Sequence, residues 1–591
     1  MNASSFDALP GGRVYTVDRI RRAERPLLDA ETEPDQLMRS AAAAVAEAAG
    51  VMLQRAPVTP EATTVLLAVG AGGNGGDALY AGALLAGRGW PVAAVLLGRG
   101  GRVHGRALEA FREAGGEVLD LDEVWRDPAR HRLVVDGVLG MGGDGGLGED
   151  AAVLLAFASA RLIPVLSVDV PSGISADTGA TPPMVGVTDP PDPRAGATGI
   201  LGRTVLKRDR VPAHAIADVT VTFGGLRRAH AVNAYCGQVV LANPGLGEDP
   251  SQTIGARLTR GRDRGDASVD VEATRAVVPG GEYDFAGTSL RGVPESPVDR
   301  VRAPGPYDDK YSGGVVGICA GSEAYPGAAV LTTTAAVRTT SAMVRYVGGA
   351  AGDVVRACPE VVWAPTVGES GRVQAWVVGP GRGTGDEAAE ELEALLRRPE
   401  PVVVDADAVT LLAGRGELRT LLSARGESGS DPAPTVLTPH AGEFRRLAEA
   451  VGGVPDPDDD RIGAAVALSR ALGCVVLLKG RHTVVTDGKR VTCTDAGTSW
   501  AATPGSGDVL AGMTGALVAE SEARLGRQFD GARRTVSALY PANHAVALHA
   551  VAASVSARTP EGEAPTSASR IAEAIPRARA SAGPAYSLRA Y

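Results

Sequence analysis

Cysteine is scarce in this sequence of 591 residues, and it follows no spacing pattern. The five cysteines lie far apart along the chain, at Cys236, Cys319, Cys358, Cys474 and Cys493, and no CxxC pair occurs. The sequence therefore indicates neither a disulfide framework nor a CxxC metal site. Reduced, mostly buried thiols are the simplest interpretation, and they fit a cytoplasmic protein.

Long apolar runs and long basic runs are also missing. The first residues, Met1 to Asp7, contain no basic segment followed by an apolar one, so no secretory signal peptide is predicted. The most apolar stretch, residues 327–344, contains several threonines and Arg338 and is not expected to cross a membrane. The formal net charge is −10, so nucleic acid is not an expected partner.

Several common catalytic motifs are absent as well. The chain has no HExxH pair, no Ser-His-Asp order and no GxxxxGK[ST] loop, which argues against a metalloprotease and a Walker-type nucleotidase. The first glycine-rich turn does not follow the GxGxxG spacing of a Rossmann dinucleotide site. His544 and His549 are five residues apart, whereas two ligands on one helix face are four apart. We therefore interpret residues 537–557 as an ordinary helix.

Glycine, in contrast, is abundant, with 77 residues, and short apolar runs alternate with helical patterns along the whole chain. This alternation predicts α/β domains with parallel sheets, and the chain is too long for a single core. A stretch rich in Arg, Asp, Gly and Pro interrupts the pattern near the middle. We predict a three-layer α/β/α domain over residues 1–247, a linker over 248–306 and a second α/β/α domain over 307–591.

Polar residues follow three predicted strands of the first half. Asn74 and Asp77 come after residues 63–69, Asp136 ends the run at 133–135, and Asp169 and Ser172 end the run at 164–170. Any one of these residues could be a helix cap or a turn residue. Because the carboxyl ends of parallel strands meet at one sheet edge, the three together predict a site there. Such oxygen-rich side chains suit a hard cation, with one carboxylate left for proton transfer.

In the second half, glycine-rich polar motifs again follow apolar runs. The most informative is Thr503-Pro504-Gly505-Ser506-Gly507-Asp508, which leads directly into a small-residue apolar helix. Free backbone amides at a helix N-terminus can hold a phosphate, and Asp508 can act as a base. Taken alone, this loop could equally be an ordinary glycine-rich turn. Its position in the chain after other strand-end motifs favours a phosphoryl-transfer site.

Taken in order, the motifs resemble the bifunctional NAD(P)HX repair enzymes, in which a YjeF N-terminal epimerase domain precedes a ribokinase-like, ADP-dependent dehydratase domain. The first half resembles the epimerase through the segments Leu37-Met38, Gly73-Asn74-Gly75-Gly76-Asp77, Asp136, Ser167-Val168-Asp169, Ser172-Gly173, Asp177-Thr178-Gly179 and residues 217–223. The second half resembles the dehydratase through Lys310-Tyr311, Gly321-Ser322, Tyr325 to Ala329, Gly379-Pro380-Gly381, Asp405-Ala406-Asp407, Thr438 to Glu443, Lys479-Gly480 and Gly505 to Asp508. The resemblance covers almost the whole chain.

The resemblance implies an N-terminal Rossmann-like domain that interconverts the R and S epimers of hydrated nicotinamide cofactors, NADHX and NADPHX. Asp169 then matches the catalytic residue, and Asn74, Asp136 and Ser172 match the ligands of a K⁺ ion. The implied substrate-binding residues are Gly73, Asn74, Gly75, Gly76, Asp77, Gly140, Met141, Gly142, Gly143, Asp144, Gly145 and Gly146.

For the second domain, the resemblance implies dehydration of S-NAD(P)HX to NAD(P)H at the expense of ADP, which gives AMP and phosphate. Asp508 matches the catalytic residue, and Mg²⁺ is implied together with ADP. Ala328, Gly381, Gly383 and His440 match substrate-binding positions. The implied nucleotide-binding residues are Lys479, Gly480, Arg481, His482, Thr483, Gly505, Ser506 and Gly507.

Two other interpretations stay open at this point. The second half could be a ribokinase-like kinase of a small metabolite, or the first half could be a binding module whose Asp169 site is inactive. The products distinguish the first alternative, and an Asp169→Asn variant distinguishes the second. We further expect a homo-oligomer whose partners are the small molecules NADHX, NADPHX and ADP, with no membrane and no nucleic acid.

Overall fold

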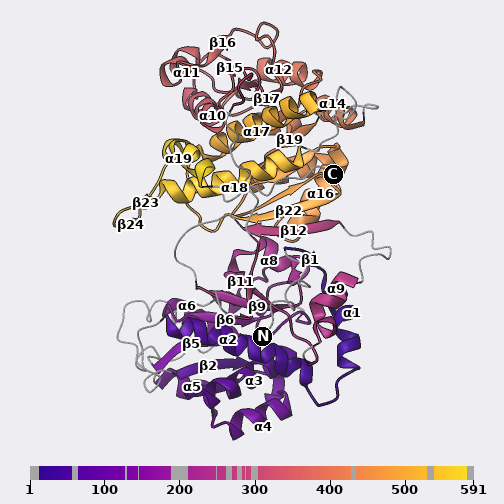
Figure 1. Cartoon of the computed structure of the whole chain (residues 1–591), viewed down its shortest axis with the longest axis vertical. Coiled ribbons are helices and arrows are strands. Elements are labelled where there is room, and N and C mark those ends of the chain that lie inside the picture. The colour runs from indigo at the N-terminus through magenta and orange to yellow at the C-terminus, as the bar shows by residue number, and fades with distance from the viewer. Residues whose placement is uncertain are drawn as a thin grey trace. The chain divides into compact units, whose positions relative to one another are not determined.

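The computed structural model shows a chain that divides into two compact units (Figure 1). Unit 1 comprises Met1–Ser268 and Gly280–Pro294, and unit 2 comprises Val269–Pro279 and Glu295–Tyr591. The structure describes residues 12–55, 64–126, 130–143, 145–187, 210–247, 249–260, 269–275, 283–285, 288–294, 304–427, 434–528 and 538–581.

Unit 1 is built on an eight-stranded sheet in which all pairs are parallel except the pair at one edge. The strands, in spatial order, are β13 (Arg291–Gly292), β11 (Gln238–Ala242), β9 (Val219–Phe223), β6 (Val165–Val168), β5 (His131–Gly137), β2 (Thr64–Val69), β3 (Val92–Leu96) and β4 (Glu117–Leu119). The central strand β2 is buried along its whole length, as an apolar run in a parallel sheet should be.

Helices cover both faces of this sheet. Val65 and Leu67 of β2 pack in one hydrophobic cluster with α2 and α3, whereas Leu66 packs in a second cluster with α6. The helices of unit 1 are α1 (Val17–Leu28), α2 (Gln36–Gln54), α3 (Gly73–Gly87), α4 (Gly105–Glu113), α5 (Leu121–Arg126), α6 (Glu149–Ala160), α8 (Arg228–Val232) and α9 (Ile254–Arg260). The α/β/α class predicted for the first half is therefore confirmed.

The first glycine-rich turn is shorter than its sequence indicates. Helix α3 begins at Gly73, so Asn74 and Asp77 lie in its first turns and not in a loop before it. A Cβ atom at Gly75 would overlap the carbonyl oxygen of Gly70, so a side chain larger than hydrogen does not fit there. The glycines thus allow the helix to start directly against the end of β2.

Unit 2 contains a ten-stranded sheet, again mostly parallel, in which β21 is antiparallel to both of its neighbours. The spatial order is β12 (Asp270–Arg275), β22 (Arg490–Asp495), β21 (His482–Thr486), β20 (Val475–Leu478), β19 (Thr435–Leu437), β18 (Val402–Val404), β17 (Ala375–Val378), β14 (Val316–Cys319), β15 (Val344–Val347) and β16 (Val362–Ala364). Five of these strands, β14, β17, β18, β19 and β20, match apolar runs that carry polar motifs at their ends, as predicted.

The helices of unit 2 complete the second α/β/α domain. They are α10 (Pro326–Thr339), α11 (Ala351–Ala357), α12 (Asp386–Leu396), α13 (Asp407–Gly414), α14 (Gly416–Glu427), α15 (Ala441–Val451), α16 (Arg461–Leu472), α17 (Ser506–Gln528), α18 (Leu539–Ser556) and α19 (Ala568–Ala580). Helices α10, α17, α18 and α19 share one hydrophobic cluster with Val316 and Val377 of the sheet. Trp376, the neighbour of Val377 on β17, is fully buried outside that cluster.

The segment predicted as a linker, residues 248–306, contributes a strand to each sheet. Strand β12 extends the sheet of unit 2 alongside β22, and β13 pairs with β11 in unit 1. Val271 and Ala273 are buried in β12 while Glu272 between them is exposed. This period-two burial explains why a mixed, polar sequence can still form an edge strand.

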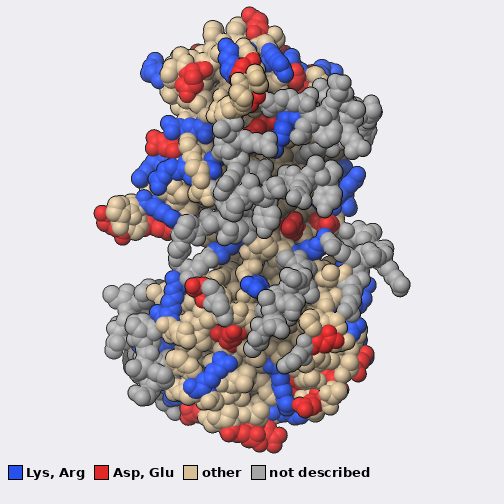
Figure 2. Space-filling model, in the orientation of Figure 1, with Lys and Arg blue, Asp and Glu red and all other residues tan. Residues whose placement is uncertain are grey.

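Acidic and basic side chains are mixed over the face shown in Figure 2, within the part of it that the structure describes. None of the helices formed by described residues is both long enough and apolar enough to span a membrane.

Candidate functional site

In unit 1, the residues after β2, β5 and β6 meet at one edge of the sheet, as predicted. The hydroxyl of Ser172 donates a hydrogen bond to the Asp136 carboxylate over 2.5 Å, and the Ser172 amide donates to the other carboxylate oxygen over 2.9 Å. Ser167 donates to the same oxygen over 2.8 Å. Burial raises the pKa of Asp136, and these hydrogen bonds oppose the shift.

Asn74 completes this group from the first turn of α3. Its amide nitrogen donates to the carbonyl oxygens of Val168 and Leu139, over 2.5 Å and 3.2 Å. The Ser172 hydroxyl also lies 3.0 Å from the Leu139 carbonyl oxygen. Carbonyl oxygens from the ends of β5 and β6 therefore converge on the Asn74 amide.

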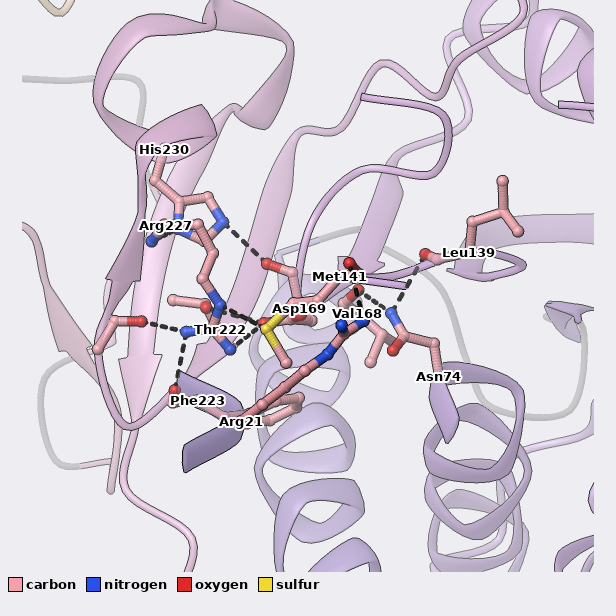
Figure 3. Close-up of polar contacts among 11 residues, drawn as sticks. Arg21, Asn74, Leu139, Met141, Val168, Asp169, Thr222, Phe223, Arg227 and His230 are labelled. Carbon is pink, nitrogen blue, oxygen red and sulfur yellow. Dashed lines mark hydrogen bonds and ion pairs between the residues drawn. The ribbon is translucent and has the colours of Figure 1, made fainter. Parts of the chain in front are cut away.

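Asp169 is the next residue after β6, and it is almost completely buried (Figure 3). Its carboxylate forms an ion pair with Arg227 over 2.8 Å and accepts a hydrogen bond from the Thr222 hydroxyl over 3.1 Å. Its carbonyl oxygen is 2.8 Å from Nε2 of His230. Asp169 has a φ of +66°, a backbone conformation that is strained for a non-glycine residue.

Arg227 is fully buried and is held by the turn after β9 (Figure 3). One guanidinium nitrogen donates to the carbonyl oxygens of Phe223, over 3.0 Å, and of Gly225. Another lies 3.0 Å from the sulfur of Met141, one of the predicted substrate-binding residues. No sequence motif pointed to Arg227 or His230; the only signal was an arginine pair four residues after the end of an apolar strand.

Two further carboxyl groups interact electrostatically with Asp169. Burial, together with the charges of Asp169 and Glu24, raises the pKa of Asp77 well above its usual range. Burial also raises the pKa of Glu24 to about 7, while Arg227 opposes that shift. Glu24 lies in α1, a helix in which the sequence predicted no site residue. A carboxyl group with a pKa near 7 can exchange protons with a substrate at neutral pH.

The other predicted substrate-binding residues of unit 1 lie in the two turns beside this group. A Cβ atom at Gly140 would overlap the side-chain amide of Asn74, so the loop after β5 passes directly over that amide. Asp144 lies outside the described residues. The first turns of α3 contain Gly73, Gly75 and Gly76, and the loop between β5 and α6 contains Gly142, Gly143, Gly145 and Gly146.

In unit 2, Asp508 lies in the first turn of α17, at the predicted loop. Burial raises its pKa to about 7; the negative charges of Asp405, Asp407 and Glu443 add to the shift, and Lys479 opposes it. The carboxyl of Asp508 can therefore gain and lose a proton near neutral pH, as a general base must.

Lys479, at the end of β20, lies among these carboxylates. Its ammonium nitrogen is 2.7 Å from Oδ1 of Asp405 and 4.0 Å from Oε2 of Glu443. The same Asp405 oxygen accepts a hydrogen bond from the Thr438 hydroxyl over 2.7 Å. Burial favours the neutral amine, but the carboxylates outweigh it and raise the pKa of Lys479.

Two of the predicted substrate-binding residues of unit 2, His440 and Gly383, contact carboxylates of this charged group. His440 caps α15 and lies 3.2 Å from Oε1 of Glu443. The amide of Gly383 donates to Asp407 over 2.8 Å. A Cβ atom at Gly381 would lie 2.8 Å from that of Ala328 at the start of α10, so these two predicted residues are neighbours.

The predicted nucleotide-binding segments differ in how their side chains are used. Arg481 donates to Asp495 over 2.7 Å, and burial lowers the pKa of His482 to about 4. The Thr483 hydroxyl donates to the carbonyl oxygen of Gly480 over 3.0 Å. A Cβ atom at Gly507 would lie 3.2 Å from the ammonium of Lys479. The segment from Lys479 to Thr483 and the segment from Gly505 to Gly507 are therefore neighbours.

The helix predicted over residues 537–557 is confirmed as α18, and it brings one further residue to this loop. His549 of α18, predicted to belong to an ordinary helix, has its Nε2 atom 3.0 Å from the hydroxyl oxygen of Ser506. No local pattern indicates this contact, because Ser506, the partner of His549, belongs to another helix.

Two family descriptions match the chain, one in each unit. The family described as YjeF-related protein N-terminus matches residues 34–229, and the family described as NAD(P)H-hydrate dehydratase matches residues 316–577. Among solved structures, the ADP/ATP-dependent NAD(P)H-hydrate dehydratase from Bacillus subtilis, co-crystallised with ATP and Mg²⁺, is 24% identical, with a TM-score of 0.38; the match covers 47% of this chain and 93% of that chain.

Curated relatives match both units together. The bifunctional NAD(P)H-hydrate repair enzyme Nnr of Corynebacterium glutamicum is 46% identical over 96% of this chain and 98% of its own length. The protein of the same name from Mycobacterium tuberculosis is 43% identical over 85% of this chain and 89% of its own. The chain therefore belongs to the family of bifunctional NAD(P)H-hydrate repair enzymes.

Proposed function

We propose that this chain repairs hydrated nicotinamide cofactors in two steps. Unit 1 interconverts the R and S epimers of NADHX and NADPHX, and unit 2 dehydrates the S epimer to NADH or NADPH while ADP is converted to AMP and phosphate. The observation that supports this most is the position of Asp508, a carboxyl with a pKa of about 7 at the start of α17, beside the buried Lys479–Asp405 pair.

In the dehydratase reaction, the Asp508 carboxylate takes the proton from the ring hydroxyl of S-NAD(P)HX. The hydroxyl oxygen attacks the β-phosphorus of ADP, a new P–O bond forms, and the bond to the bridging oxygen breaks to release AMP. Phosphate then leaves with the electrons of its C–O bond, and loss of a proton from the neighbouring carbon forms the ring double bond. Asp508 supplies the base and unit 2 holds the two reactants in line.

The nucleotide phosphates are held by the backbone amides of Gly505 and Gly507 at the N-terminus of α17, and by the segment from Lys479 to Thr483; the Ser506 amide donates to the carbonyl oxygen of Thr503 over 3.2 Å. An amide-rich helix N-terminus favours an anion. Mg²⁺ enters with ADP, because phosphate oxygens and water are its usual ligands. Ala328, Gly381, Gly383 and His440 contact NAD(P)HX.

In unit 1, Asp169 acts on the substrate at the hydrated carbon, and Asp77 and the glycine-rich turns bind the cofactor. Arg227 keeps Asp169 in a fixed position through their ion pair. Glu24, with its pKa of about 7, takes a proton from the substrate or donates one to it, while Asp169 stays in its ion pair with Arg227.

K⁺ fits the oxygen atoms around Asn74. Asp136, Ser172 and Asn74 would hold it together with the carbonyl oxygens of Leu139 and Val168, which already converge on the Asn74 amide. A monovalent cation suits such a set, in which one carboxylate is accompanied by neutral oxygens. When bound, K⁺ supplies a fixed positive charge beside the substrate turns. The homo-oligomer and the cytoplasmic location stay predictions.

The test is an assay with a mixture of R- and S-NADHX, ADP and Mg²⁺, in which the return of reduced-nicotinamide absorbance is followed. We expect full recovery, with one AMP and one phosphate formed for each NADH. Asp169→Asn should limit fast recovery to the S share, and Asp508→Asn should abolish it. A stable phosphorylated product without return of NADH would mean that unit 2 is a kinase and would overturn the proposal.

A further inference from the structure

A histidine of α18 forms a hydrogen bond with the loop that precedes Asp508. Nε2 of His549 and the hydroxyl oxygen of Ser506 are 3.0 Å apart, and the two residues are only 7% and 4% exposed. Helix α18 packs against α17 and α19 in the same hydrophobic cluster. A buried hydrogen bond therefore links the first residue of α17 to a helix that follows it in sequence and carries no predicted site residue.

The backbone on either side of Ser506 is closely packed. Gly505 has a φ of +80°, and a Cβ atom there would lie 2.6 Å from a methyl group of Leu331 in α10 and 3.2 Å from the Cβ of Ala568 in α19. Gly507 faces the Lys479 ammonium. The turn thus lies between the charged group at the end of β20 and the helical layer that contains His549, and the Ser506 hydroxyl is its polar contact with that layer.

His549 is suited to hold this hydroxyl without adding charge to the site. Burial lowers the pKa of His549 to about 4, and the nearby Lys479 charge acts in the same direction. The imidazole is therefore neutral at pH 7. A neutral imidazole can accept a hydrogen bond from the hydroxyl or donate one to it, according to its tautomer.

We propose that His549 is a positioning residue of the dehydratase site: through Ser506 it fixes the first turn of α17, and with it the amide of Gly507 and the carboxyl of Asp508. It touches neither ADP nor NAD(P)HX. This inference rests on the proposed function of unit 2, because it assigns a role within that reaction.

The test compares two amides at position 549 with removal of the partner hydroxyl. The side-chain amide of glutamine reaches the position of imidazole Nε2, whereas that of asparagine is too short. His549→Asn and Ser506→Ala should each lower kcat/KM of ADP-dependent dehydration of S-NADHX about tenfold, the effect of losing one buried neutral hydrogen bond. His549→Gln should recover most of the loss. The double variant His549→Asn/Ser506→Ala should have a kcat/KM no more than about twofold below that of the less active single variant.

Two controls separate this result from a loss of structure and from failure of the proposed function. His544→Gln, on the same helix, should leave kcat/KM unchanged, and circular dichroism and the midpoint of thermal unfolding confirm that each variant is folded. The wild-type assay tests the dehydratase function on its own. The inference is overturned if folded His549→Asn retains wild-type kcat/KM, if glutamine does no better than asparagine, or if the losses of the two single variants multiply in the double variant.

Discussion

The ammonium nitrogen of Lys479 lies 2.7 Å from Oδ1 of Asp405, and the same lysine faces Gly507 in the loop that carries Asp508. The side chain of Lys479 is 17% exposed and that of Asp405 1%. The positive charge of Lys479, fixed by its ion pair with Asp405, lowers the pKa of Asp508 and can also attract phosphate. The acid–base behaviour of the site should therefore depend on Lys479.

The first prediction concerns the pH dependence of dehydration. Because Asp508 must be ionised to act as a base and its pKa is about 7, kcat should fall about tenfold for each pH unit below that value. Lys479 lowers the pKa of Asp508, so Lys479→Met should move this limb of the profile to higher pH. The measurement is kcat against pH at saturating ADP. The exposed Lys489→Met is the control, and an unmoved profile in Lys479→Met would show that the two groups are not coupled.

The second prediction concerns stability. The pKa of Asp508 is raised from 3.8 to about 7 on folding, so between these values the folded state binds more protons than the unfolded one. The contribution of Asp508 to stability is therefore complete below pH 3.8 and is lost as pH rises to about 7. Asp508→Asn should stabilise unit 2 at pH 8 relative to wild type, and less so at pH 5. Urea unfolding at the two pH values measures this difference. The exposed Asp459→Asn should show no such dependence, and an equal effect of Asp508→Asn at both values would refute the linkage.

The sequence was informative where function depends on residues at strand ends. The apolar run at 63–69 became β2, and Asn74, Asp136 and Ser172 came together because parallel strands bring their carboxyl ends to one edge. The Asp508 loop was likewise visible as glycines before an apolar helix. These features are local, or they follow from the topology of a parallel sheet.

The remaining parts of the site depend on tertiary packing that no local pattern encodes. Arg227 reaches Asp169 from the short strand β10 (Leu226–Arg227), and Glu24 approaches from α1. His549 meets Ser506 because of the way α18 packs against α17. Each is a single residue without a motif, and its partner is far away in the sequence. A buried arginine also contradicts the usual expectation that charged side chains are exposed.

The third prediction tests the proposed K⁺ site by steric means. A Cβ atom at Gly140 would overlap the Asn74 amide, so Gly140→Ala should push that amide away from the carbonyl oxygens of Leu139 and Val168. We expect a loss of K⁺ affinity of about 10- to 100-fold. The measurement is the K⁺ concentration that gives half-maximal epimerisation. Gly148→Ala, in the same loop but facing open space, is the matched control. Unchanged K⁺ dependence in Gly140→Ala would place the ion elsewhere.

The fourth prediction concerns the buried ion pair of unit 1. Arg227→Met would leave Asp169 buried without its counter-charge, which should destabilise unit 1 by about 3–5 kcal/mol, whereas Arg22→Met, at the exposed pair with Asp18, should leave the stability nearly unchanged. Urea unfolding measures both.

The double variant Arg227→Met/Asp169→Asn separates the structural role of the pair from its catalytic one. Removing both charges takes away the uncompensated carboxylate, so part of the lost stability should return, while epimerisation stays abolished because Asp169 is gone. Dehydration of S-NADHX by unit 2 should continue in every folded variant. If Arg227→Met alone were as stable as wild type, the ion pair would not be what holds Asp169 in position, and the structural role given to Arg227 would be wrong.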